Sequence, residues 1–148
     1  MAYPNPPILV SPPNESIVIG NVIVFVFTVP SDADNNTLVF RVELDITNPP
    51  NAAHTHYKVN ESRFANDLKT NGNWQVQDSG SNFIHMPTGG IGSEYYGRDA
   101  RVFIRKQDTV NYPDIDGAWY WRISAGDGMG HPVLFNRAIF AQAVFGVT

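Results

Sequence analysis

Residues 22–29 read Val-Ile-Val-Phe-Val-Phe-Thr-Val, an uncharged run of β-branched and aromatic side chains. Such a run is typical of a β-strand, because these side chains pack well on a pleated sheet. Apolar side chains fall on both faces of this strand, so we expect a central strand that is covered on both sides or nearly so. The turn-forming pair Gly20-Asn21 comes directly before it.

Residues 38–46 are expected to form the next strand, because apolar and polar side chains alternate there. The side chains expected to face the core are Leu38, Phe40, Val42 and Leu44, and those expected to face solvent are Val39, Arg41, Glu43 and Asp45. Further strands are predicted around Ile8–Val10, Tyr57–Phe64, Trp74–Gln77, Ala100–Arg105, Trp119–Ala125 and Ala138–Val147.

Two stretches of the middle region do not follow a strand pattern. Residues 63–69 suit one or two helical turns as well as a strand, and residues 78–98 are predicted to be a long glycine-rich loop. Apart from these stretches, the 11 prolines and 12 glycines separate short apolar runs and leave little room for helix. The expected fold is all-β, a sandwich of two antiparallel sheets in which residues 1–148 form one domain. The first and last strands are the expected edges.

Charge and composition exclude several classes of function. The net charge is −4 and the ten basic residues are scattered, so we expect no nucleic-acid partner, which needs a clustered positive surface. No stretch approaches 18 apolar residues, so no membrane-spanning segment is expected. The absence of cysteine excludes disulfides, thiolate zinc sites and cysteine nucleophiles. The chain has no nucleophile elbow and no His-Glu-x-x-His motif, so we do not expect an enzyme.

Residues 119–128 read Trp-Tyr-Trp-Arg-Ile-Ser-Ala-Gly-Asp-Gly, which resembles the penultimate strand of fibronectin type III-like domains and the Asp-Gly loop after it. Residues 24–40 are similar to the second and third strands of that family, and residues 140–147 to its last strand. The resemblance covers about half of the chain and implies an immunoglobulin-like sandwich. Two departures are visible: Trp119 stands where such domains often have a corner tyrosine, and residues 47–99 form an elongated middle region.

The elongated middle is similar to variants of this fold in phage virion proteins. Tyr57, the pair Glu61-Ser62 and Trp74 match that picture. The resemblance implies a non-enzymatic structural or assembly module on the virion surface, either a capsid decoration or a tail or fibre component. Its partner would then be a protein, either a neighbouring virion subunit or a second copy of the chain.

The segment Asp32-Ala33-Asp34-Asn35-Asn36 carries oxygen ligands at alternating positions. Calcium prefers six to eight such oxygens. In a sandwich of the expected topology Asp127 lies near Asp32 and Asp34, so these three carboxylates are a candidate calcium site. The alternative is a turn in which Asp and Asn side chains bond to their own backbone, with no cofactor.

Aromatic residues in or near the predicted loops are candidates for binding. Tyr57, Tyr95, Tyr96 and Tyr112 could stack on sugar rings or anchor a protein interface. They support an alternative function, a carbohydrate-binding or adhesion domain of a bacterial or phage protein that binds a surface glycan. Such a domain would be extracellular or lie on the cell surface.

Overall fold

The computed structural model describes residues 4–19, 22–45, 63–67, 73–105, 117–126 and 139–147. Almost all regular structure in these residues is β-strand, and the exception is a short 3-10 helix, η2, at Ser93–Tyr95. The strands are β1 (Ile8–Ser11), β2 (Ser16–Val18), β3 (Val22–Thr28), β4 (Val39–Asp45), β5 (Arg63–Asp67), β6 (Trp74–Gln77), β7 (Phe83–His85), β8 (Asp99–Arg105), β9 (Gly117–Gly126) and β10 (Ile139–Val147). The prediction of an all-β fold is confirmed.

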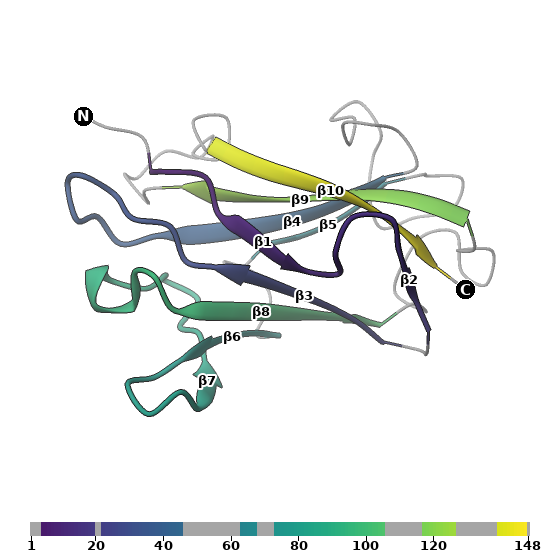
Figure 1. The fold of residues 1–148 in the computed structure, drawn as a ribbon. Helices are drawn as coiled ribbons and strands as arrows, with labels where there is room; N and C mark the ends of the chain where they lie inside the picture. Colours follow the sequence, from purple (N-terminus) through teal and green to yellow (C-terminus); the bar gives the residue numbers. More distant parts are fainter. Residues whose placement is uncertain are drawn as a thin grey trace.

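The strands form two five-stranded sheets that lie one above the other (Figure 1). One sheet has the order β1-β3-β8-β6-β7 and the other the order β2-β10-β9-β4-β5. The strand pairs are antiparallel except for one: Phe145–Val147 of β10 runs parallel to Ser16–Val18 of β2. The N-terminal segment therefore changes sheets between β1 and β2.

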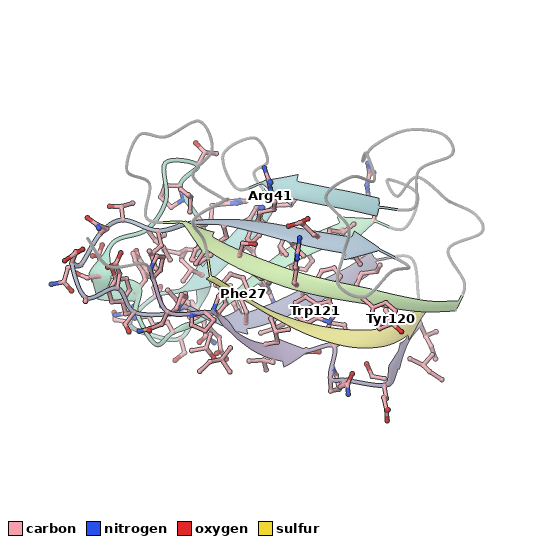
Figure 2. The ribbon with its side chains drawn as sticks, turned by 90° about the horizontal axis from the view of Figure 1, so that it is seen from above. Phe27, Arg41, Tyr120 and Trp121 are labelled. Carbon is pink, nitrogen blue, oxygen red and sulfur yellow. The ribbon has the colours of Figure 1, made fainter. Side chains whose placement is uncertain are left out.

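The core lies between the sheets, where large rings interlock. The ring centroids of Phe25 and Trp121 are 4.6 Å apart, and those of Phe27 and Phe40 are 5.0 Å apart, so each pair spans the two sheets. Trp74 of β6 stacks on Phe40 at 6.1 Å. The same layer holds Phe27 and Trp121 (Figure 2). Each buried side chain of this size stabilises the fold by about 1.5–3 kcal/mol.

β3 is a central strand, as predicted, but its two faces differ. Ile23, Phe25 and Phe27 are fully buried, whereas Val22 is 42% exposed and Val24 and Val26 are half-buried. Cover is complete on the inner face and only partial on the outer face, which is less than the expected cover on both sides or nearly so.

β4 departs from the predicted alternation at two outward positions. Val39 is buried, because Gly90 lies against its side chain and Ile91 exchanges backbone hydrogen bonds of 2.8 and 3.0 Å with Leu38. Glu43 is 4% exposed rather than solvated, because Arg122 lies opposite it on β9 and forms an ion pair with it. The four predicted core positions of this strand are buried, as expected.

Two predictions about edges and loops are corrected. β1 is an edge strand, but β10 is not, because it lies between β9 and β2. Residues 63–67 form strand β5 because they pair with β4, although the local sequence also suits helix. The predicted loop at 78–98 contains β7 and η2. Residues 57–62 of the predicted strand at 57–64 lie outside the described residues.

Candidate functional site

Asp32 lies in the connection between β3 and β4 and is 2% exposed. Its Oδ1 accepts the backbone N–H of Asp34 at 2.9 Å, and its carbonyl oxygen accepts the N–H of Asn35 at 2.9 Å. Asn35 has a φ of 53°, the left-handed conformation that Asn tolerates in turns. The described atoms thus form the self-bonded turn that was the alternative to calcium.

The calcium site stays a prediction. Asp32 is buried and Asp34 exposed, and Asp127 lies outside the described residues. Within the part of the chain that the structure describes, no three His, Cys, Asp or Glu side chains are grouped so that they could hold a metal ion. Oδ2 of Asp32 is enclosed and has no hydrogen-bond partner among the described atoms.

The predicted binding pair Tyr95 and Tyr96 lies at η2, where both rings are half-buried against the core. The Tyr96 hydroxyl donates a 2.6 Å hydrogen bond to the carbonyl oxygen of Asn36. Burial raises the pKa of Tyr96 above 10.0, and the negative charges of Asp32 and Glu94 raise it further. The structure therefore joins Tyr96 to the β3–β4 connection that contains Asp32, a link that the sequence did not predict. Tyr57 and Tyr112 lie outside the described residues.

An arginine stack on the outer face of the β1-containing sheet was also missed. The guanidinium of Arg101 lies 3.9 Å from the ring centroid of Phe83 and 4.8 Å from that of Phe103. Its Nε donates a 2.8 Å hydrogen bond to Oε1 of Gln75 on the neighbouring strand. Contacts of this type stabilise by about 0.5–1 kcal/mol at exposed sites. They hold β6, β7 and β8 together on their outer face.

A polar cavity of about 380 Å³ opens between the β6–β7 turn and the segment that leads into β8. Its lining residues are Gln77, Asp78, Ser79, Ser81, Gly97, Arg98 and Asp99. These residues are spread over two separate chain segments without a recognisable motif, so no sequence pattern indicated the cavity.

Exposed large apolar side chains are concentrated near the N-terminus. Among the described residues they are Ile8 (65% exposed), Val10 (47%), Ile17 (66%), Ile19 (81%), Val22 (42%) and Ile84 (37%). We call the first five the N-terminal apolar residues. They lie on or next to β1, β2 and β3, and Glu15 is the one charged residue among the first 31 of the sequence. That stretch without basic residues was visible in the sequence, but which of its side chains are exposed was not.

No protein-family model and no curated protein sequence matches this chain. The described residues include no helix with the length and apolar character needed to cross a membrane.

Proposed function

We propose that the chain is an immunoglobulin-like module, close to the fibronectin type III pattern. In an immunoglobulin sandwich the strands lettered A, B, E and D share one sheet, and G, F and C share the other. The order β1-β3-β8-β6 beside β10-β9-β4 follows that arrangement, with β5 in the additional position next to C. This agreement in strand order supports the resemblance seen at residues 119–128.

The module's function is assembly: it binds a neighbouring subunit on the surface of a phage particle, as a capsid decoration or as a part of the tail or fibre. The observation that carries this proposal is the concentration of exposed apolar side chains in residues 8–22. Single exposed apolar side chains are normal on a protein surface. Five of them within 15 residues of chain favour this segment as the part of the described residues that a partner covers. Five of the six exposed large apolar side chains of the described residues fall in this one segment.

Hydrogen bonds and strand pairing hold this part of the chain in place. Asn5 donates two hydrogen bonds to Ser31, one from its backbone N–H at 2.9 Å and one from its side chain at 2.8 Å. β1 pairs with β3 in one sheet and β2 pairs with β10 in the other. Because these strands are already ordered, the module would lose little backbone entropy when a partner covers them.

The virion as the location rests on the resemblance of Tyr57, Glu61-Ser62 and Trp74 to phage virion proteins. Purified phage particles from the source of the gene test it directly. We expect mass spectrometry of particles from a density gradient to detect the chain. A chain that is present in the lysate but missing from the particles would contradict the virion assignment.

The double variant Ile17→Lys/Ile19→Lys tests the binding surface. Both side chains are exposed, so the isolated variant should melt like the natural protein, while its incorporation into particles should fall at least about tenfold. Ile84→Lys is the matched control, because Ile84 is exposed on the distant strand β7 and should leave incorporation unchanged. Equal incorporation of the double variant would overturn the proposed interface.

A further inference from the structure

The polar cavity between β6–β7 and β8 is built by two segments that face each other. The β6–β7 turn supplies one wall, and the residues that follow η2 supply the other. Val76 pairs with Ala100, which brings Gln77 of β6 beside Asp99 of β8. The cavity is distant in sequence from the N-terminal apolar residues.

The turn that forms the first wall is fixed by its own hydrogen bonds. Oδ1 of Asp78 accepts the backbone N–H groups of Gly80 and Asn82 at 2.9 and 3.0 Å. The N–H of Asp78 donates to the carbonyl oxygen of Asn82 at 2.8 Å. Because Oδ1 is used in the turn, Oδ2 of Asp78 has no partner among the described residues and can accept a bond from a ligand.

The opposite wall also has unused hydrogen-bonding capacity. Arg98 places its guanidinium 5.3 Å from the Tyr95 ring and donates one N–H, from Nη1, to the carbonyl oxygen of Gln77 at 3.4 Å. Oδ1 of Asp99 accepts the hydroxyl of Thr28 at 3.3 Å, which leaves its Oδ2 for a ligand. Among the described residues, neither Asp78 nor Asp99 forms an ion pair with Arg98.

This set of groups selects the chemistry of a ligand. The lining has no apolar side chain, so an apolar ligand would lose more by desolvation of the wall than it gains. Two carboxylates disfavour an anion, and the described residues hold no group of three His, Cys, Asp or Glu side chains that could bind a metal ion. A neutral molecule with several hydroxyl groups satisfies both the acceptors and the donors of the lining. Each hydroxyl can donate to a carboxylate and accept from Arg98 or Ser79.

We propose that this cavity is a binding site for the hydroxyl groups of a neutral sugar, with Asp78 and Asp99 as acceptors and Arg98 as donor. A volume of about 380 Å³ lies at the lower end of the range of small-molecule sites, which fits a ligand of one or two sugar rings. The site goes beyond the assembly function and does not depend on it.

Titration of the ¹⁵N-labelled protein with methyl glucoside, methyl galactoside, methyl mannoside and N-acetylglucosamine tests the proposal. We expect at least one sugar to give saturable shifts in the amide signals of Gly80, Gly97 and Asp99, with Gly89 unaffected. The permethylated glycoside has the same ring but no hydroxyl donors, and it should cause no shift. If none of the four sugars shifts these amides, the proposal is wrong.

Two variants within the cavity, Asp99→Asn and Ser79→Trp, locate the binding. Asp99→Asn keeps an acceptor for Thr28 but removes the charge, and it should weaken sugar binding about tenfold. Glu94→Gln is the control, since it removes an exposed carboxylate outside the cavity and should leave binding unchanged. Ser79→Trp should fill the cavity and abolish the sugar-induced shifts, while the other amide signals remain those of the folded protein. Equal binding by the natural protein and by both cavity variants would overturn the assignment.

A linear glucose oligosaccharide distinguishes a free sugar from a surface polysaccharide. Tighter binding of the oligosaccharide than of methyl glucoside would indicate a polymer as the source, and equal binding would indicate a free monosaccharide. Both results support the site. Failure of the assembly tests would leave this result unaffected, because the N-terminal apolar residues do not line the cavity.

Discussion

Glu43 and Arg122 form a largely buried ion pair across β4 and β9. Nε and Nη2 of Arg122 donate to the two carboxylate oxygens of Glu43, each at 3.3 Å, and the exposed fractions of the two side chains are 5% for Glu43 and 12% for Arg122. A pair of this kind contributes little net stability compared with apolar residues of similar volume, but each partner depends on the other. The pair therefore fixes how β4 lies against β9.

We expect Arg122→Met to lower the free energy of unfolding by about 3–5 kcal/mol, because it removes the guanidinium that pairs with the buried Glu43 carboxylate. The double variant Glu43→Leu/Arg122→Met should recover most of this loss. Urea unfolding of the three proteins measures both effects. A single variant that unfolds within about 1 kcal/mol of the natural protein would show that the pair is dispensable.

Tyr96 links η2 to the β3–β4 connection through its hydroxyl, so Tyr96→Phe should cost about 0.5–1.5 kcal/mol at neutral pH. The pKa of this hydroxyl is higher in the folded than in the unfolded chain. Its contribution is therefore fully present below the unfolded value of 10.0 and is lost as the pH rises through the folded pKa. The stability difference between the two proteins should shrink above pH 10, as measured by urea unfolding, and a constant difference would contradict this account.

The sequence predicted single residues well where one local pattern decides their environment. Leu38, Phe40 and Val42 are buried as the alternation requires. The prediction that Glu43 faces solvent was wrong, because its burial depends on a partner in a strand about 80 positions away in the sequence. The cavity was missed for the same reason, since Asp78 and Asp99 share no local pattern.

At the scale of elements, the connection between β7 and η2 closes over β4. Gly90 in this connection has a φ of +102°, and a Cβ there would overlap the carbonyl oxygen of Leu38. Gly97 has a φ of +83° with no atom near its Cβ position, and Gly89 has neither constraint. Substitutions at these three glycines therefore distinguish the cost of steric overlap from the cost of backbone strain.

We expect Gly97→Ala to cost about 1–2 kcal/mol, the penalty of an L-residue in the left-handed conformation. Gly90→Ala should cost more, because it also disturbs the bridge between Leu38 and Ile91, and Gly89→Ala should be neutral or slightly stabilising. Thermal unfolding of the three variants measures the order. A Gly90→Ala protein as stable as Gly89→Ala would contradict the close packing of this connection over β4.

The long strands β3, β4, β8 and β9 were predictable, since each carries a run of apolar residues in alternation or nearly so. β5 and β7 were not, because these two short strands are defined by their pairing with β4 and β6 rather than by their own composition. The parallel pairing of β2 with the end of β10 was also missed. The three residues of β2 are too few to form a pattern that identifies the strand with which they pair.

At the scale of the whole molecule, two sheets close on one core and leave apolar side chains exposed on the N-terminal strands. The closure followed from the sequence, because two strongly apolar strands need a common layer in which to bury their inner faces. The exposed residues were not predicted, since the same β-branched side chains serve as core on one face and as surface on the other. Ile23 is fully buried, whereas Val22 is 42% exposed.

Accessibility of position 19 measures the assembly surface most directly. The chain has no cysteine, so Ile19→Cys provides a single thiol, and Thr88→Cys, at an exposed position in another part of the chain, provides the control. The account predicts that a maleimide labels both variants in the isolated protein, and that in purified particles it labels Thr88→Cys but not Ile19→Cys. Labelling of Ile19→Cys in particles at the rate of the isolated protein would contradict it.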